Sequence, residues 1–153
     1  VLAAVEAAGL RIVQLHGEET PAFAQAVKDA VGPAVAVWKA FRVAGAADLE
    51  ALSRYACDAW VLDARAPGVR GGSGRTFDWD LLAGVPRARP LVLAGGLNPA
   101  NVADAVRSVR PDWVDTASGV ESAPGIKDAR AVERFIRAAR AAVGGRPRPP
   151  GSP

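Results

Sequence analysis

Two glycine-containing turns in the second half of the sequence have the composition of an anion site. Gly95-Gly96 follows the apolar run Pro90–Ala94, and Ser118-Gly119 follows the run Trp113–Thr116. Neighbouring glycines let backbone N–H groups converge on an anion, and the start of a helix adds the positive end of its dipole. Either turn alone is explained more simply as a tight connection, but two of them at adjacent strand ends favour a bound phosphate.

Two aspartates stand where a reacting or binding carboxyl group is expected. Asp63 closes the apolar run Ala59–Ala64, where partial desolvation at a strand end favours a carboxyl group that can donate a proton. Capping of the next loop is an equal alternative from position alone. Asp115 lies inside the run Trp113–Thr116, and a charge in a strand must pair or face a site. Asp63 is therefore a candidate general acid, and Asp115 is a candidate for hydrogen bonding to a substrate amine or hydroxyl group.

The chain has one histidine and one cysteine. His16 follows the run Arg11–Leu15 and is a candidate substrate-binding residue, although a hydrogen bond to the local backbone is slightly favoured from position alone. A histidine-based or cysteine-based metal centre is not expected, nor is an internal disulfide. Cys57 is expected to be a buried small hydrophobe, and a lone cysteine fits a cytoplasmic protein. No cofactor or metal is expected.

The segment Arg65–Thr76 is rich in glycine but does not fit a nucleotide-binding phosphate loop. That motif requires glycine where Val69 stands and lysine where Arg75 stands. We expect a glycine-hinged loop that closes over a substrate, the alternative being a merely flexible connection.

Short apolar runs alternate with helical patterns, which is typical of βα units that build a parallel sheet. The runs are continuous, as expected for strands covered on both faces. Thr20-Pro21 and Asn98-Pro99 each predict a helix start, because proline is tolerated at the first helical position. The expected strands are Arg11–Leu15, Val35–Phe41, Ala59–Ala64, Pro90–Ala94 and Trp113–Thr116, and the expected helices are Ala22–Ala30, Ala46–Tyr55, Ala100–Val109 and Asp128–Val143.

Two architectures use this alternation, an open doubly wound sheet and a closed (β/α)₈ barrel. An open sheet normally carries a glycine-rich turn after its first strand, whereas here the glycines follow late strands. This placement favours the barrel, in which chemistry sits at the carboxyl ends of the strands and phosphate is bound late in the chain. We expect one α/β domain over residues 1–143 and a disordered Pro/Gly/Arg tail over residues 144–153.

Composition excludes several classes of partner. Apolar stretches are interrupted well short of the roughly 20 residues that cross a membrane, so no membrane partner is expected. The formal net charge is +3, but the arginines are scattered, which argues against nucleic acid. The basic balance instead fits a solvated surface that attracts small anionic molecules.

Motifs spread along the chain resemble, in order and spacing, the phosphoribosylanthranilate isomerase family. The resemblance reaches from near the start of the chain to about residue 140. It is carried by Val13–Glu19 (VQLHGEE), Lys39–Phe41 (KAF), Leu62–Ala64 (LDA), Gly71–Trp79 (GGSGRTFDW), Leu93–Val102 (LAGGLNPANV), Val114-Asp115 and Ser118–Asp128 (SGVESAPGIKD).

The resemblance implies a TIM barrel and a cofactor-free Amadori rearrangement of a small sugar phosphate. N-(5-phosphoribosyl)anthranilate is converted to 1-(2-carboxyphenylamino)-1-deoxyribulose 5-phosphate in tryptophan biosynthesis. By position in the motifs, Asp63 is the general acid and Asp115 lies near the anthranilate amine. The backbone around Gly95, Gly96, Ser118 and Gly119 holds the phosphate.

Departures from the family pattern imply an incomplete barrel. The family's general base is a cysteine at the end of the first strand, in a Cys-Gly-Ile-Thr-like motif, and an arginine after the second strand helps to hold the substrate. Neither motif occurs here, so the resemblance implies about five βα units, strands 4–8, in a chain that is inactive alone. A smaller departure is Thr116-Ala117, where the family usually has Val-Ser.

Two other functions stay open at this point. One is another phosphate-binding barrel, such as indole-glycerol-phosphate synthase, which needs lysines at strand ends, and Lys39 alone is a poor supply. The other is a non-catalytic barrel remnant that binds anions or self-associates through open sheet edges.

Overall fold

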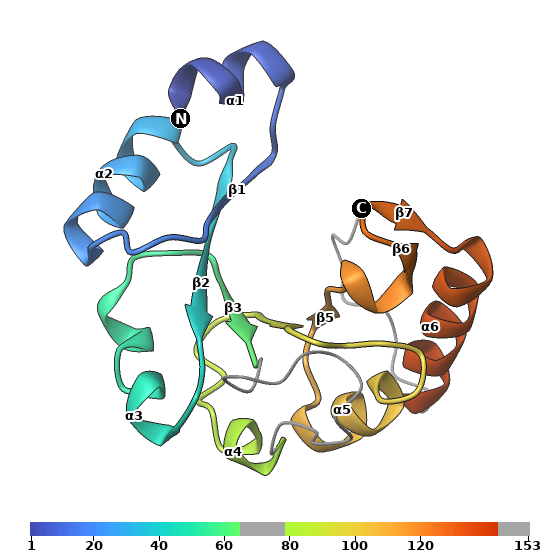
Figure 1. The fold of residues 1–153 in the computed structure, drawn as a ribbon. Coiled ribbons are helices and arrows are strands. Elements are labelled where there is room, and N and C mark those ends of the chain that lie inside the picture. Colours follow the sequence, from blue (N-terminus) through green and yellow to red (C-terminus); the bar gives the residue numbers. More distant parts are fainter. Residues whose placement is uncertain (65–78, 144–153) are drawn as a thin grey trace.

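The described part of the chain is an α/β fold built on one parallel sheet. The structure is a computed structural model that describes residues 1–64 and 79–143. Five strands lie side by side in the order β1-β2-β3-β4-β5, and helices α2 to α6 form an arc around the outside of the sheet (Figure 1). The strands are β1 (Ile12–Leu15), β2 (Ala36–Arg42), β3 (Ala59–Asp63), β4 (Leu91–Ala94) and β5 (Trp113–Val114).

The helices alternate with these strands, as the sequence predicts. A two-stranded antiparallel hairpin, β6 (Glu121–Ala123) with β7 (Ile126–Lys127), follows the sheet and was not expected. The helices are α1 (Leu2–Ala8), α2 (Pro21–Val31), α3 (Ala46–Leu49), α4 (Asp80–Ala83), α5 (Val102–Val109) and α6 (Ala129–Ala142), with 3₁₀ turns η1 (Leu52–Arg54) and η2 (Ser118–Val120).

Two helix starts follow from side-chain caps. The Oγ1 atom of Thr20 accepts a hydrogen bond from the Phe23 N–H at 3.2 Å, and Pro21 is the first residue of α2, as predicted. A carboxylate oxygen of Asp128 accepts from the N–H groups of Arg130 and Ala131, which begins α6. Such caps satisfy N–H groups that have no partner inside a helix.

The predictions for α5 and α3 were wrong in part. The helix expected over Ala100–Val109 begins at Val102. The Asn98 side chain accepts from the N–H groups of Ala100 and Asn101, as a capping residue does, and the turn that it caps leads into α5. The single helix expected over Ala46–Tyr55 is α3 followed by η1. The expected loop Arg65–Thr76 and tail 144–153 lie outside the described residues.

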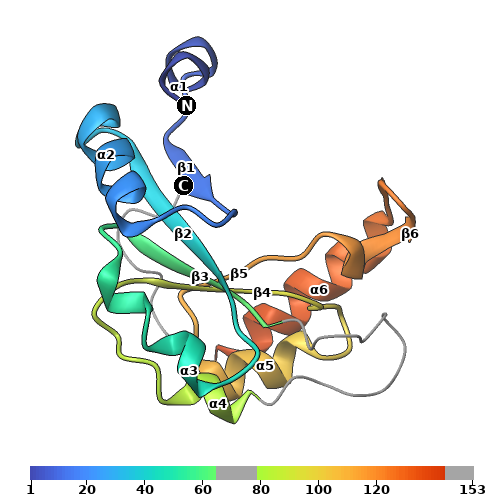
Figure 2. The same cartoon turned by 60° about the vertical axis from the view of Figure 1, so that its left-hand side comes forward.

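The sheet is strongly curved. Trp38 of β2 and Trp113 of β5 face each other across the concave side, with ring centroids 5.4 Å apart. Since β2 and β5 are three strand spacings apart, a flat sheet would separate them by about 14 Å. The curvature, which Figure 2 shows from the side, is that of a barrel wall.

Apolar side chains pack on both faces of this wall. Between the sheet and the helices lies a large core that includes Trp60, Leu62, Leu93 and Phe135. The concave face carries a smaller cluster of Ala40, Val61, Val92 and Ala94, with Trp38 and Trp113 against it. Alternate residues of one strand therefore point to opposite cores, which decides which side chains reach the concave face.

At two places in the sheet, an aspartate that precedes one strand forms hydrogen bonds with the parallel strand before it in the sequence. The Asp58 carboxylate accepts from the Val37 N–H at 2.8 Å, and the Asp58 N–H donates back to the Val37 carbonyl. Asp112 makes the same pair of hydrogen bonds with Leu91, again across 21 positions of sequence. Both ties lie at the amino ends of the strands and fix the register there.

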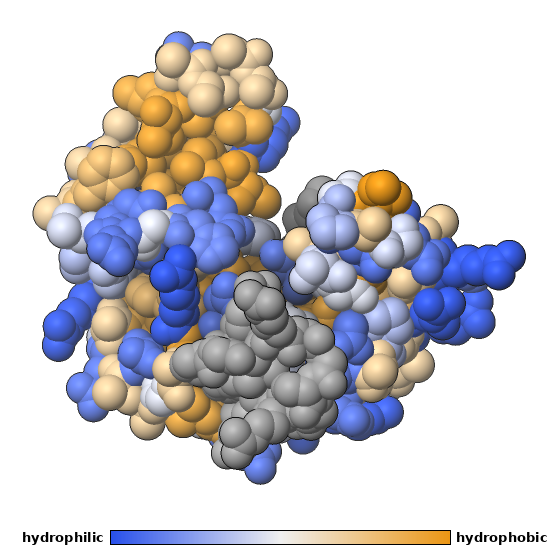
Figure 3. All heavy atoms as spheres, in the orientation of Figure 1, coloured by the Kyte–Doolittle hydropathy of each residue, from blue (hydrophilic) through white to orange (hydrophobic). Residues whose placement is uncertain are grey.

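Apolar groups are exposed over α1, α2 and β1. They gather in the upper left of Figure 3 and include Leu2, Leu10, Ile12 and Phe23. In the ranges 1–64 and 79–143, no helix has both the length and the apolar character needed to cross a membrane.

Candidate functional site

The carboxyl ends of β1 and β3 bring His16 and Asp63 together. Asp63 is the last residue of β3, as predicted, and shares the concave face with Val61. The Nε2 atom of His16 lies 3.8 Å from the Oδ2 atom of Asp63, with 49% of the His16 side chain and 20% of the Asp63 side chain exposed. The pair therefore sits at the mouth of the concave face, open to a ligand.

Gln14 orients the imidazole ring. Its Nε2 atom lies 3.2 Å from the Nδ1 atom of His16. Because an amide NH₂ group only donates, this arrangement makes Nδ1 the acceptor and corresponds to the neutral ring with its hydrogen on Nε2, which faces Asp63. The alternative favoured from sequence, that His16 binds the local backbone, was wrong for the residues that the structure describes.

The second oxygen of Asp63 has an unusual position. Its Oδ1 atom is buried and has no hydrogen-bond partner in the described part of the chain. A buried polar atom without a partner is costly, on the order of 1–3 kcal/mol, unless a ligand supplies one. The alternative role for Asp63, capping of the following loop, concerns residues that lie outside the described part of the chain.

Two asparagine side chains fix the conformation of the turn after β4. Gly95 and Gly96 have positive φ angles of 88° and 65°, which a residue with a Cβ rarely adopts. The side-chain amides of Asn98 and Asn101 both donate to the Gly96 carbonyl, at 3.5 and 3.1 Å. No hydrogen bond within the described ranges uses the N–H groups of Gly95 or Gly96, so both stay available to an anion.

The turn after β5 is packed directly against the turn after β4. The Thr116 hydroxyl group donates to the Leu97 carbonyl at 2.6 Å. A Cβ atom on Gly119 would lie 1.8 Å from the same carbonyl oxygen, so only glycine fits there. The structure thus brings Gly95-Gly96 and Ser118-Gly119 together, and Thr116, a departure from the family pattern, makes one of the connecting bonds.

Asp115 lies one residue beyond β5, not inside the strand as predicted. The strand ends at Val114, but the Asp115 N–H still donates to the Leu93 carbonyl at 2.8 Å. This bond continues the ladder by one step, and the alternation of side chains places Asp115 on the same side as Trp113. Asp115 is exposed and lies at the same end of the sheet as Asp63.

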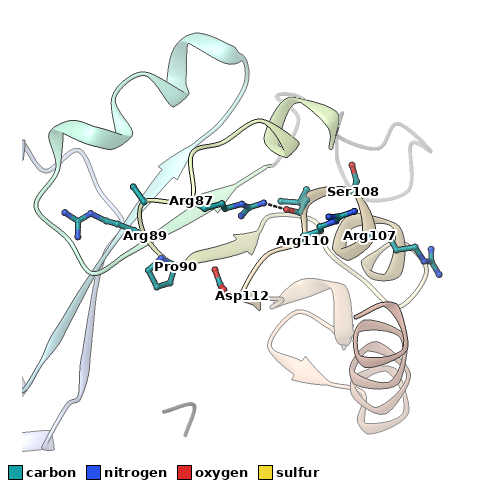
Figure 4. Close-up of a pocket in the computed structure, with 9 residues that line it drawn as sticks. Arg87, Arg89, Pro90, Arg107, Ser108, Arg110 and Asp112 are labelled. Carbon is teal, nitrogen blue, oxygen red and sulfur yellow. Dashed lines mark hydrogen bonds between the residues drawn. The ribbon is translucent and has the colours of Figure 1, made fainter. Parts of the chain in front are cut away.

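The cavity drawn in Figure 4 lies at the opposite end of the strands. It has a volume of about 820 Å³ and lies before β4 and β5, among Arg87, Arg89, Arg110 and Asp112. The arginine side chains point in different directions, and Arg87 donates to the Val109 carbonyl. They do not converge on one point, so the chemistry belongs to the carboxyl ends of the strands.

Comparison with known proteins decides the family. Residues 1–138 match the profile of a family described as N-(5'phosphoribosyl)anthranilate (PRA) isomerase. The N-(5'-phosphoribosyl)anthranilate isomerase of Pelobacter propionicus is 49% identical over 135 residues, which cover 88% of this chain and 62% of that protein. This chain belongs to the phosphoribosylanthranilate isomerase family. It spans 62% of the Pelobacter relative and also 62% of the Erythrobacter litoralis isomerase, to which it is 49% identical.

Solved structures of phosphoribosylanthranilate isomerases agree with this assignment. The crystal structure from Thermotoga maritima has a TM-score of 0.78 and 40% identity, over 92% of this chain and 66% of that one. A second, solved in complex with reduced 1-(o-carboxyphenylamino)-1-deoxyribulose 5-phosphate, has a TM-score of 0.74 and 37% identity, over 92% of this chain and 64% of that one. The parallel α/β fold expected from sequence is therefore confirmed, and so is the resemblance to the family.

Lys39 and Cys57 lie on the helix side of the sheet. Lys39 is 3% exposed and Cys57 is 0% exposed. Burial raises the pKa of the Cys57 thiol, which fits the buried small hydrophobe that the sequence predicts. Neither residue reaches the mouth, so Lys39 does not supply the strand-end lysine that indole-glycerol-phosphate synthase chemistry needs.

The sequence did not identify the residues that hold the candidate site in place. Gln14 orients His16, Asn101 supports the Gly96 carbonyl, and Thr116 links the two turns. These three polar side chains lie in or next to the recognised motifs, but nothing in their spacing shows which group each of them binds. For Lys39 the sequence does give an indication, because a charged residue in the middle of an apolar strand must pair with other polar groups.

Proposed function

We propose that this chain supplies the acid and the phosphate-binding turns of a phosphoribosylanthranilate isomerase. The observation that carries the proposal is the carboxylate of Asp63 at the end of β3, with one buried, unpaired oxygen and His16 at 3.8 Å. The membership of the chain in the family and the adjacent glycine turns support it. The substrate is N-(5-phosphoribosyl)anthranilate and the product is 1-(2-carboxyphenylamino)-1-deoxyribulose 5-phosphate.

The five strands correspond, in this proposal, to strands 4–8 of an eight-stranded barrel. The Trp38–Trp113 contact supports this, because it gives the sheet the curvature of a barrel wall. The coverage also fits, since the chain spans 62% of the Pelobacter isomerase. Residues 1–143 would then form the barrel portion, and residues 144–153 would follow it as a tail.

Each candidate residue has a role in the proposed reaction. Asp63 transfers its proton to the furanose ring oxygen while the bond from that oxygen to C1′ breaks, which leaves a Schiff base. A base then removes the proton at C2′, and the resulting enolamine tautomerises to the ketone. The backbone N–H groups of Gly95-Gly96 and Ser118-Gly119 hold the phosphate, while Asp115 binds the anthranilate amine and His16 contacts the substrate beside Asp63.

The base that removes the C2′ proton is, in this proposal, not a cysteine of this chain. Cys57 is the only cysteine of the 153 residues, and it is buried on the helix side of the sheet. Loss of a positioned base costs a factor of roughly 10²–10⁴ in rate. We therefore expect the 153 residues alone to give no turnover above background.

Complementation tests the proposal. The purified chain is assayed alone and together with the amino-terminal part of the Pelobacter isomerase that it does not match. We expect turnover of phosphoribosylanthranilate only from the combination, with the amino-terminal part alone and a combination carrying Asp63→Asn as controls. Turnover by the chain alone, or an unchanged rate with Asp63→Asn, would contradict the assigned roles.

A further inference from the structure

Lys39 is the only charged side chain among the described residues that is buried. Its Nζ atom donates to the Gly17 carbonyl at 3.0 Å and to the Ala40 carbonyl at 2.7 Å, and it pairs with a Glu19 carboxylate oxygen at 3.1 Å. Nζ also lies 5.4 Å from the centre of the Phe41 ring. A buried ammonium group is costly unless it is paired in this way.

Glu19 closes the same network from the other side. Both of its carboxylate oxygens accept from the Gly17 N–H, each at 3.0 Å, and its own carbonyl accepts from the Tyr55 hydroxyl group at 3.1 Å. Burial alone would raise the pKa of Glu19, but hydrogen bonds from backbone N–H groups and from Lys39 outweigh it and lower that pKa. The ionised form of Glu19 is therefore the one that the fold holds.

The network fixes both polar backbone groups of Gly17, the residue that follows His16. The Gly17 N–H is bound by Glu19 and the Gly17 carbonyl by Lys39. The His16 ring is exposed and would otherwise be free to move away from Asp63 with its loop. Lys39 lies on β2, between the strands that carry His16 and Asp63, so it ties this loop to the centre of the sheet.

We propose that Lys39, with Glu19, is a positioning residue for the isomerase reaction. It acts from the helix side of the sheet, through the Gly17 peptide groups, and sets the direction in which His16 faces Asp63. It touches neither the substrate nor the reacting atoms. The link to the reaction depends on the proposed function, but the ordering of His16 does not.

Lys28 provides a matched control. It also pairs with an aspartate, Asp58, but at the amino ends of the strands and with 35% of its side chain exposed. Lys28→Met therefore removes an ion pair and the same amino group without touching the loop at His16. Lys39→Met is the test variant, since it keeps the length of the side chain and loses its charge and its donors.

The test reads the ring of His16 directly. His16 is the only histidine of the 153 residues, so one set of imidazole signals appears in NMR spectra of the full chain labelled with ¹⁵N. In the unmodified chain we expect the tautomer with hydrogen on Nε2. We expect Lys39→Met to broaden or split these signals and mix the tautomers, whereas Lys28→Met leaves them unchanged even if it lowers Tm.

Two further measurements keep the outcome clear. If Lys39→Met does not fold, Glu19→Gln takes its place, because it keeps the shape and one acceptor but removes the charge. Unchanged His16 signals in the folded variant overturn the proposal. In the complemented enzyme, Lys39→Met should lower kcat by about 10²-fold with a smaller change in KM. An unmodified combination without turnover would refute the proposed function and leave the NMR result standing.

Discussion

At the scale of single residues, Asp63 is the group whose replacement tests the chemistry most directly. Asp63→Asn keeps size and hydrogen bonding but removes the transferable proton, so in the complemented enzyme kcat should fall by roughly 10²–10⁴ while KM changes little. Steady-state kinetics with a parallel measurement of Tm separates this from a structural role. A loss confined to KM would make Asp63 a binding residue, and Asp115 would be the next acid to test.

Glu19 gives a prediction about pH. Its pKa in the folded chain is lowered, so the folded state favours the ionised form relative to the unfolded chain. The stabilisation is complete above the ordinary glutamate pKa of about 4.3 and is lost as the pH falls through the lower folded value. The difference in unfolding midpoint between the unmodified chain and Glu19→Gln should thus be constant near neutral pH and shrink below about pH 4.

Urea unfolding at a series of pH values measures this difference. Glu133→Gln is the control, because the Glu133 carboxylate is largely exposed on α6 and pairs with Arg137, one turn away on the same helix. A Glu19→Gln difference that stays constant down to acid unfolding would show that ionisation of Glu19 adds nothing to the stability of the fold.

At the scale of elements, the turn after β4 should bind phosphate through its backbone. Gly96 has φ of 65° with open space where a Cβ would stand, so valine there strains the backbone rather than colliding with neighbours. Gly96→Val should abolish binding of inorganic phosphate by the chain, measured by ³¹P NMR. Gly32→Val is the control, since Gly32 has φ of 70° and equally open space at the end of α2. Phosphate binding that survives in Gly96→Val would place the anion elsewhere.

The sequence predicted the strands more closely than the helix starts and the site contacts. The strands β3 and β4 are apolar runs that are buried on both faces, which leaves few alternatives to a strand. The start of α5 was placed too early, within the turn that the Asn98 side chain caps, because helix ends are less sharply specified by sequence than strands. Asp63 and the glycine turns could be placed from their strand ends. The bond from Thr116 could not, because its partner is distant in the sequence, and the bond from Gln14 depends on side-chain rotation.

At the scale of the whole molecule, β1 and β5 are the outermost strands of the described sheet. Ile12 of β1 is 40% exposed, and α1 buries none of its residues. An exposed, apolar strand edge is a template for pairing with another chain. We therefore expect the 153-residue chain to self-associate as its concentration rises.

Size-exclusion chromatography with light scattering measures this mass. Ile12→Lys should shift the chain toward the monomer, because a charge on an edge strand opposes pairing. Phe23→Lys is the control, since Phe23 is 46% exposed but lies on α2, away from the strand edge. A monomer at every concentration in the unmodified chain would contradict the expectation, and an equal effect of both variants would point to general apolar attraction.

The aspartate ties at Asp58 and Asp112 have a consequence for engineering. They lie at the end of the sheet opposite to Asp63 and the glycine turns, and they are built alike across the same 21 positions. The two ties therefore hold the strands together at the end that lies opposite to the proposed site. Mutagenesis libraries confined to the amino ends of the strands can therefore search for a more thermostable protein without changing the proposed site. The two similar aspartate ties also offer junctions at which βα segments can be exchanged between relatives.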